Sequence, residues 1–271
     1  MEKQHNEPIL SAAGLSLGYG TRQIVSNVQL SITPGSFTVI IGPNGCGKST
    51  LLRALGRLLK PQGGQVMFDG ADLAGLKPKQ VAQRIGLLAQ SPQVPDSITV
   101  ADLVLRGRTP YQGLFQQFSG EDADIVHRAL AAVGLTGFAH RQVQELSGGQ
   151  RQRAWIALVL AQQTGVLLLD EPTTYLDISH QLEVLELCQA LRGSGRTLIA
   201  VLHDLALAAR YATELIAMRD GRIIASGTPQ QVLTEETLRE VFDLDARIIQ
   251  DPETGRPLVI PRARITEPIN S

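Results

Sequence analysis

The most informative part of the chain reads Gly42-Pro43-Asn44-Gly45-Cys46-Gly47-Lys48-Ser49-Thr50. The apolar run Phe37–Ile41, typical of a buried strand, comes directly before it. Leucines at helical spacing follow it on one predicted face, at positions Leu51, Leu52, Leu55, Leu58 and Leu59. A glycine-rich loop between a strand and a helix is the context that a P-loop requires. The motif therefore predicts that the chain binds a nucleoside triphosphate.

The residue types in this motif suit a phosphate group. Gly42, Gly45 and Gly47 let the backbone turn tightly with its N–H groups inward, and the N-terminus of the following helix adds further donors. Lys48 is a point charge that can reach the β and γ phosphates, so it is also a catalytic candidate. The Ser49 hydroxyl can ligate Mg²⁺. We expect the whole motif to line the nucleotide site, with Mg²⁺ as a cofactor.

Composition places the chain among globular proteins. Its 271 residues are 43% hydrophobic, enough for a sizeable core, and its net charge of −1 provides no bulk attraction to nucleic acid or anionic lipid. The two cysteines, Cys46 and Cys188, exclude a disulfide framework and fit a reducing cytosol. The segment Met1–Pro8 is polar, and the longest apolar runs fall short of the roughly 18 residues of a membrane span. We therefore expect a soluble protein.

The pattern of elements predicts an α/β fold. Short alternating runs over Ile9–Ile32 predict an antiparallel β layer. Val166–Leu169 and Thr197–Leu202 are continuous apolar runs typical of a parallel sheet buried on both faces. The region between, from Pro92 to about Gln162, has helical signals, including capping boxes. We predict a core with a parallel sheet, an N-terminal antiparallel β subdomain, an inserted helical subdomain and a short tail over Asp245–Ser271.

A second motif, Leu146-Ser147-Gly148-Gly149-Gln150, points to a helix N-terminus. Ser147 and Gln150 have the spacing of a capping box, so a helix is predicted to begin here. Gly148 and Gly149 would allow an anion to approach the backbone closely. A well-capped helix with no ligand is the alternative, but the presence of a P-loop in the same chain favours contact with phosphate.

Two carboxylates follow the third informative run, Val166–Leu169. Asp170 and Glu171 stand at the end of a predicted buried strand, which is where open α/β sheets bind ligands. Asp170 suits Mg²⁺, directly or through water. Glu171 is placed to orient and deprotonate an attacking water molecule. The alternative is that both simply mark the end of a strand.

Together these three motifs resemble those of the ATPase subunit of an ATP-binding cassette (ABC) transporter. The resemblance covers about Ile9 to Pro261, with the motifs in the family's order. It implies a P-loop (RecA-like) core, with a cassette domain at 8–244, a helical subdomain inserted at about 92–162 and a C-terminal tail at 245–271. It also implies that the nucleotide is ATP and that the chain is an ATPase.

The resemblance implies roles for four further residues. Tyr19 is similar to the family's aromatic residue that stacks on adenine, and Gln90 to the glutamine that senses the γ-phosphate and Mg²⁺. Asp177 is similar to the aspartate of a loop that communicates across a dimer, and His203 to the histidine that contacts the γ-phosphate. The other histidines are interpreted as structural: His5, His127, His140 and His180.

The family's geometry implies a homodimer. Two copies would sandwich two ATP molecules, each held between the P-loop of one copy and the Leu146–Gln150 segment of the other. The helix N-terminus at Ser147 agrees with this expectation, because it is an anion site with no other evident occupant.

Three kinds of cassette ATPase carry motifs of this sort: an importer subunit, a soluble cassette acting on nucleic acid or ribosomes, and a regulatory module with little turnover. The second usually carries tandem cassettes, a coiled-coil insertion or basic tails, and none is found here. The third fits poorly with the presence of Glu171 and His203. Three stretches are similar to the iron-chelate (ferric siderophore) importer branch, which includes ferric enterobactin uptake: Ala101–Tyr111, Thr173–Gln181 and Asp251–Leu258. Cobalamin and haem importers share this architecture and are the alternative.

The importer interpretation implies partners and a location. Two integral membrane permease subunits would hold the ATPase at the cytoplasmic face of the bacterial inner membrane, and a periplasmic siderophore-binding protein would act with it indirectly. No nucleic-acid partner is expected. The permease contact is expected near Gln90–Leu114, with Arg106 and Arg108 as candidate interface charges. An exposed charged face without a partner is the alternative.

Overall fold

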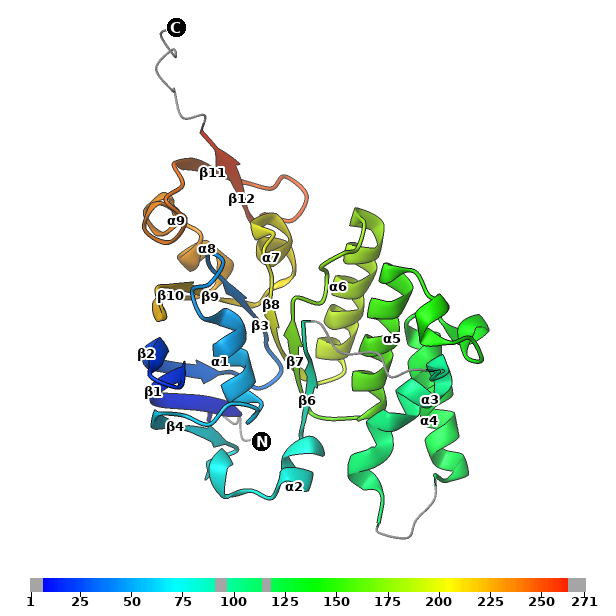
Figure 1. Ribbon diagram of the computed structural model, residues 1–271. Coiled ribbons are helices and arrows are strands. Elements are labelled where there is room, and N and C mark those ends of the chain that lie inside the picture. Colours follow the sequence, from blue (N-terminus) through cyan, green and yellow to red (C-terminus); the bar gives the residue numbers. More distant parts are fainter. Residues whose placement is uncertain (1–6, 91–96, 114–117, 263–271) are drawn as a thin grey trace, which may run out of the picture.

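The computed structural model describes residues 7–90, 97–113 and 118–262 (Figure 1). The strands are β1 (Leu10–Tyr19), β2 (Arg22–Ile32), β3 (Phe37–Ile41), β4 (Gly63–Phe68), β5 (Ala71–Asp72), β6 (Ile85–Leu88), β7 (Val166–Asp170), β8 (Thr197–Val201), β9 (Glu214–Arg219), β10 (Arg222–Gly227), β11 (Ala246–Gln250) and β12 (Pro257–Pro261). The helices are α1 (Lys48–Leu55), α2 (Pro78–Ala82), α3 (Val100–Leu105), α4 (Gly120–Ala132), α5 (Gly148–Ala161), α6 (Ile178–Gly193), α7 (Leu205–Tyr211), α8 (Pro229–Val232) and α9 (Glu235–Phe242). Short 3₁₀ turns occur at Leu73–Gly75, Arg106–Tyr111, Thr136–Phe138 and Val143–Glu145.

A six-stranded sheet in the order β10-β9-β3-β8-β7-β6 forms the core. All neighbours in it are parallel except β9 and β10, which form an antiparallel hairpin. Every residue of β3, β7 and β8 is buried, as a sheet covered on both faces requires. Alternate residues serve opposite faces: Ile40 and Leu168 pack with α1, whereas Val39 and Leu169 pack with α5 and α6. This confirms the predicted α/β fold with a parallel-sheet core.

A smaller antiparallel sheet, in the order β2-β1-β4-β5, covers the same face of the core sheet as α1 (Figure 1). β1 and β2 pair from Leu10 with Ile32 to Tyr19 with Arg22, so the predicted antiparallel layer over Ile9–Ile32 is confirmed. The pairing of Tyr19 with Arg22 places both residues at the tight turn that faces the P-loop end of the molecule.

The structure ends α1 earlier than the leucine pattern predicts. The helix stops at Leu55, Arg57 has a φ of 58°, and Leu58 is 66% exposed rather than packed on the helix face. The chain leaves the helix at Arg57, which adopts the left-handed region, and Gly56 packs close to the sheet, since a Cβ there would lie 3.2 Å from the side chains of Leu168 and Leu87. Gly63 and Gly64, a few residues further on, already belong to β4.

The chain between β6 and β7 forms a lobe of helices beside the core sheet (Figure 1). α3, α4 and α5 pack on one another, and their buried side chains join the hydrophobic cluster that covers one face of the sheet. The side chains of Thr99, Ser119 and Ser147 each accept a hydrogen bond from the backbone N–H three residues later. The capping boxes at Ser119 and Ser147 are therefore confirmed, whereas Thr99 is an N-cap whose hydroxyl, not its backbone N–H, donates to the Asp102 carboxylate.

Arg108 corrects the expectation of an exposed interface charge. It is 7% exposed, its Nε lies 2.8 Å from Asp122 Oδ1, and its guanidinium stacks over Tyr111 at 4.1 Å. A further N–H donates to the carbonyl oxygen of Ala161 at 2.9 Å. Arg108 therefore joins the 3₁₀ turn at Arg106–Tyr111 to α4 and α5, and is not available to a partner. The remainder of the predicted contact includes 91–96 and Leu114, which lie outside the described residues.

Replacing Arg108 with Met should lower the free energy of unfolding by about 3 kcal/mol. The change leaves Asp122 Oδ1 and the Ala161 carbonyl oxygen without the donor that Arg108 supplies. Chemical denaturation followed by circular dichroism measures the change. Arg106→Met is the matched control, since Arg106 is exposed and should alter stability by less than about 0.5 kcal/mol. Equal effects of the two changes would contradict the structural role of Arg108.

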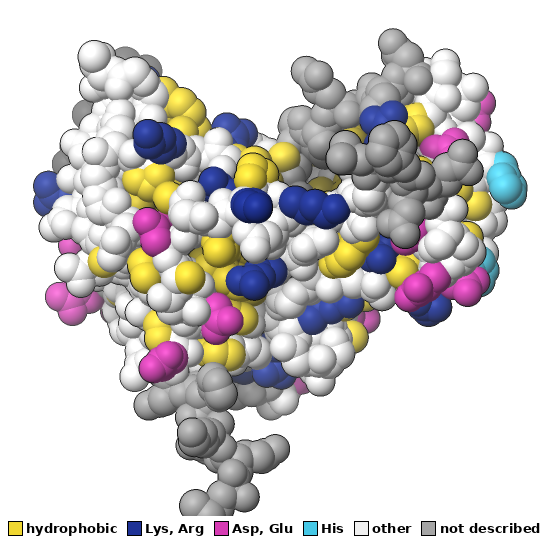
Figure 2. Space-filling view, turned by 90° about the horizontal axis from the view of Figure 1, so that it is seen from below, with side chains coloured by type: hydrophobic (Ala, Val, Ile, Leu, Met, Phe, Trp, Pro, Cys, Tyr) yellow, Lys and Arg dark blue, Asp and Glu magenta, His cyan; other side chains and the backbone are white. Residues whose placement is uncertain are grey.

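Seen from the end that carries α2 and α4, the surface is of mixed character (Figure 2). Basic side chains lie at intervals across the middle of this face, with apolar side chains between them, and acidic ones lie mainly below and toward the edges. Among the described residues of this face no broad patch of one charge is seen, in keeping with a net charge of −1.

Candidate nucleotide site

The loop between β3 and α1 has a conformation that only its glycines permit. Gly42 has a φ of 151°, and a Cβ there would lie 2.2 Å from the carbonyl oxygen of Met218. Gly47 has a φ of 106°, and a Cβ would meet Val25 at 2.9 Å. Cys46 is 4% exposed and packs among core residues, and burial raises the pKa of its thiol. Cys46 is therefore a small buried side chain that fills space beneath the loop.

Lys48 is held at the centre of this loop. Its Nζ donates to the carbonyl oxygens of Gly42 at 2.8 Å and Pro43 at 2.9 Å, and the residue is only 5% exposed. A buried ammonium group is costly unless its donors are paired. The loop therefore keeps a positive charge in place among its own backbone groups, where an anion would gain most from it.

Ser49 and Asp170 meet where β7 ends above the P-loop. Ser49 Oγ donates to Asp170 Oδ1 at 2.7 Å, and Asp170 is 2% exposed. Burial raises the pKa of Asp170, and the hydrogen bond from Ser49 opposes this shift. A hydroxyl and a buried carboxylate supply the hard oxygen ligands that Mg²⁺ prefers. The residues present therefore fit this ion.

Glu171, His203 and Gln90 form a second polar cluster. His203 Nε2 lies 2.7 Å from Glu171 Oε1, and Thr174 Oγ1 donates to Glu171 Oε2 at 3.1 Å. The side chain of Gln90 also hydrogen-bonds Glu171. Burial opposes ionisation of Glu171, but these hydrogen bonds outweigh it, so the pKa of Glu171 lies below its usual value. The carboxylate is therefore ionised near neutral pH and able to accept a proton.

The P-loop and this cluster border one cavity of about 470 Å³. Ten residues predicted for the site line it: Tyr19, Asn44, Gly45, Gly47, Lys48, Ser49, Thr50, Gln90, Glu171 and His203. Asp170 does not line the cavity but accepts a hydrogen bond from Ser49, which does. Gly42 and Pro43 do not line it either, but their carbonyl oxygens accept hydrogen bonds from Lys48. Arg22 and Ile24 also line the cavity and were missed, although Arg22 follows the Gly18-Tyr19-Gly20 turn and could have been found from the pairing of that turn.

The Leu146–Gln150 segment and Asp177 do not line this cavity. Ser147 caps α5, where its Oγ accepts from the Gln150 N–H at 3.2 Å. Asp177 caps α6 and accepts from the His180 N–H at 3.0 Å. His180 Nδ1 also lies 2.6 Å from Asp177 Oδ1, so this histidine supports the loop structure, as interpreted from the sequence. Within one chain these groups are therefore separate from the cavity that the P-loop lines.

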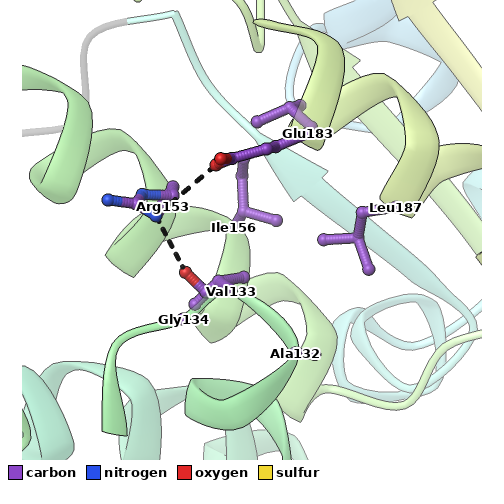
Figure 3. A pocket seen from close by; sticks show the side chains of 8 residues that line it. Ala132, Val133, Gly134, Arg153, Ile156, Glu183 and Leu187 are labelled. Atoms are coloured by element: carbon purple, nitrogen blue, oxygen red, sulfur yellow. Dashed lines mark hydrogen bonds and ion pairs between the residues drawn. The ribbon is translucent and has the colours of Figure 1, made fainter. Parts of the chain in front are cut away.

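Contacts between the region of α5 and the region of α6 hold the Leu146–Gln150 segment beside the loop that contains Asp177. Gln152 Nε2 donates to the carbonyl oxygen of Pro172 at 3.1 Å. Farther along α5, Arg153 lies 3.6 Å from Glu183 Oε2 on α6 and donates to the carbonyl oxygen of Val133 after α4, beside a cavity of about 270 Å³ (Figure 3). The beginnings of α5 and α6 therefore keep a defined spacing within one chain.

A P-loop that follows one strand of a parallel sheet, with a buried aspartate and a paired glutamate at the end of the next strand but one, β7, defines a P-loop nucleoside triphosphatase. The sequence pattern of the family described as ABC transporter matches residues 25–174. The chain belongs to this family, and it is an ATP-binding ATPase of the ABC type. Among the described residues, no helix combines the length and apolar character needed to cross a membrane.

Two relatives align along almost the whole chain. The ferric enterobactin transport ATP-binding protein FepC of Escherichia coli (strain K12) is 53% identical over 251 residues, covering 92% of this chain and 93% of FepC. The probable siderophore transport system ATP-binding protein YusV of Bacillus subtilis (strain 168) is 51% identical over 256 residues, covering 94% of this chain and 93% of YusV.

Solved structures show the same fold. An inward-facing putative metal-chelate type ABC transporter matches with a TM-score of 0.81 and 28% identity, covering 94% of this chain and 97% of that one. The cassette MJ0796, in a dimeric post-hydrolysis state bound to ADP and Pi, matches with a TM-score of 0.73 and 29% identity, covering 81% of this chain and 98% of that one. Dimerisation of cassettes of this family is thereby supported.

Proposed function

We propose that this chain hydrolyses ATP to power import of a ferric siderophore across the bacterial inner membrane, through partner permeases. The observation that carries the ATPase part is the cavity in which Lys48, Ser49, Glu171 and His203 converge. The siderophore part is supported by relatives about 50% identical whose names assign them to ferric enterobactin and siderophore transport.

In this proposal the ATP phosphates lie on the P-loop and the adenine ring lies near Tyr19. Backbone N–H groups from Asn44 to Thr50 and the N-terminus of α1 would bind phosphate oxygens. Lys48 would exchange its two carbonyl partners for oxygens of the β and γ phosphates. Tyr19 is 49% exposed at the mouth of the cavity, so its ring is free to stack on adenine.

The residues that would hold Mg²⁺ are Ser49, Gln90 and Asp170. When bound, the ion neutralises charge on the β and γ phosphates. Glu171 is the base that would accept a proton from the attacking water, and its lowered pKa keeps it ionised for this purpose. His203 Nε2–H donates to the ionised Glu171 carboxylate at 2.7 Å, which orients the carboxylate and places the imidazole beside the proposed γ-phosphate position.

A second copy would complete each site. Ser147, Gly148, Gly149 and Gln150 lie outside the cavity of their own chain, so we assign them to the γ-phosphate side of the ATP bound by the partner. Asp177, at the start of α6 beside this segment, would stand between the two ATP sites. The dimer therefore requires ATP at its interface, since each nucleotide contacts both copies.

The proposal includes a membrane location and a division into domains. Two permease subunits would hold the dimer at the cytoplasmic face of the inner membrane, with a periplasmic siderophore-binding protein acting indirectly.

The cassette domain would extend over 8–244, with a helical subdomain at about 92–162, and 245–271 would form a tail. The helices α3 to α5, which all lie between β6 and β7, support this division.

Growth of an iron-starved strain that lacks its own uptake ATPase tests this function. The strain would carry the wild type, Lys48→Ala, or the exposed control Lys60→Ala, and would be fed ferric siderophores, haem or cobalamin in turn. Rescue on a ferric siderophore by the wild type and Lys60→Ala, but not by Lys48→Ala, is expected. Rescue on cobalamin or haem alone would mean that the imported substrate is that compound and not a ferric siderophore. No rescue in the presence of both permeases would contradict the transport role.

A further inference from the structure

Thr174 stands three residues after Glu171, in the loop that joins β7 to α6. Its Oγ1 donates to Glu171 Oε2 at 3.1 Å, and its backbone N–H donates to the Glu171 carbonyl oxygen at 3.2 Å. The second of these hydrogen bonds closes a turn that begins at Glu171. A single residue therefore holds both the main chain and the side chain of Glu171.

This turn keeps Glu171 in an uncommon backbone conformation. Its φ of 53° lies in the left-handed region, which residues other than glycine seldom adopt. Such a conformation persists where the surrounding structure enforces it. The hydrogen bond from the Thr174 N–H is part of that enforcement, and the burial of Glu171, which is 9% exposed, adds to it. The direction in which the Glu171 side chain leaves the backbone is thus set by the turn.

The two oxygens of the Glu171 carboxylate are held from two different segments. Oε1 lies 2.7 Å from Nε2 of His203, in the loop after β8, and Oε2 accepts from Thr174, in the loop after β7. The last torsion of a glutamate side chain has broad minima, so a hydrogen bond to one oxygen leaves the carboxylate able to rotate. A hydrogen bond to the other oxygen opposes this rotation. The two donors together therefore fix the plane of the carboxylate.

Thr174 differs from the other two hydrogen-bonding partners of this carboxylate. Gln90 and His203 line the nucleotide cavity, and in the proposed function Gln90 also holds Mg²⁺ while His203 lies beside the γ-phosphate. Thr174 is half-buried and does not line that cavity. Within the described part of the chain, its hydroxyl donates to no group except Glu171. Loss of this hydroxyl should therefore affect the reaction through Glu171.

We propose that Thr174 is a positioning residue for the general base: its hydroxyl fixes the second oxygen of the Glu171 carboxylate and so directs the carboxylate toward the attacking water. This inference rests on the proposed function, in which Glu171 accepts the proton. A carboxylate has about four acceptor sites, so the donors on His203, Gln90 and Thr174 leave room for a water molecule. Proton transfer depends on the alignment of that water with the carboxylate.

The test measures kcat and KM for ATP hydrolysis in two variants of this position. Thr174→Val keeps the shape and loses the hydroxyl, so it should lower kcat about tenfold, as expected for one lost hydrogen bond. Its KM should stay within about threefold of the wild type, because the phosphates are bound by the P-loop. Thr174→Ser keeps the hydroxyl and should retain kcat within about threefold.

Thr173→Val is the matched control. Thr173 lies in the same loop and loses the same group, but its hydroxyl makes no hydrogen bond within the described ranges, so kcat should stay near that of the wild type. Thr174→Ala should give the same loss as Thr174→Val, so the result does not depend on how one variant packs. The melting temperature of each variant checks that the fold is kept.

A double substitution separates positioning from any other effect. With Glu171→Gln in place there is no base to position, so adding Thr174→Val should lower the residual rate by no more than about twofold. A further tenfold loss in that background would show that Thr174 acts independently of Glu171, and would overturn the inference.

Two other results would also count against it. One is a wild-type kcat in both Thr174→Val and Thr174→Ala, and the other is an equal loss in Thr174→Ser or Thr173→Val. If Glu171→Gln is slow in the same assay, the proposed function stands in either case. Wild-type turnover in Glu171→Gln would overturn the inference together with the proposed role of Glu171.

Discussion

Replacing Glu171 with Gln should lower the rate of ATP hydrolysis by about 10² to 10⁴-fold, the usual contribution of a general base. The side chain keeps its shape, and its amide oxygen can still accept from His203 while the Thr174 hydroxyl accepts in place of donating. What is lost is the ability to take a proton from water. Steady-state phosphate release measures the change.

Nucleotide affinity should stay within about threefold of the wild type, because the phosphates are bound by the P-loop and Lys48 rather than by Glu171. Glu236→Gln is the matched control, since Glu236 is an exposed residue of α9 and should not alter turnover. Turnover of Glu171→Gln close to that of the wild type would contradict the role of Glu171 as the base.

Replacing Lys48 with Ala should weaken ATP binding by roughly 10 to 150-fold, the range expected for loss of a charged hydrogen bond, and should bring turnover to background. The change removes the only side-chain cation that the loop places between its own carbonyl groups, as far as the described residues show. Isothermal titration with ATP measures the affinity.

Two controls separate binding from folding in this experiment. Lys60→Ala removes an exposed lysine and should bind ATP normally. The melting temperature of Lys48→Ala without nucleotide should remain close to that of the wild type, because water can reach the vacated carbonyls from the cavity side. Normal ATP affinity in Lys48→Ala would contradict the placement of the phosphates on this loop.

Most of the site could be predicted from the sequence, because its motifs depend on residues that are close together in the chain. The Gly42–Thr50 motif needs only its neighbouring strand and helix, and the cap at Ser147 depends on a residue three positions away. Such short-range features do not depend on the rest of the fold. The buried strands Val166–Asp170 and Thr197–Val201 were equally evident, because both faces of a parallel sheet are covered.

Features that depend on distant parts of the chain were harder to predict. Leu58 fits the helical pattern, but the chain turns at Arg57, where Gly56 packs against Leu168 from far along the chain, so the helix ends before Leu58. Arg108 looks like a surface charge until Asp122 and Ala161 are brought to it by packing of the lobe. Arg22 enters the cavity only because of the register between β1 and β2.

The insertion of the helical lobe between β6 and β7 has a mechanical consequence. The chain leaves the sheet through Gln90, just beyond the carboxyl end of β6, and returns at the amino end of β7, whose other end carries Glu171. Since the Gln90 side chain hydrogen-bonds Glu171, the residue at which the chain leaves the sheet for the lobe is joined directly to the carboxylate that faces the cavity. A change in the position of the lobe relative to the sheet would therefore shift the Glu171 carboxylate as well. We expect the rate of ATP hydrolysis to differ between the isolated protein and the protein whose lobe is bound by a partner.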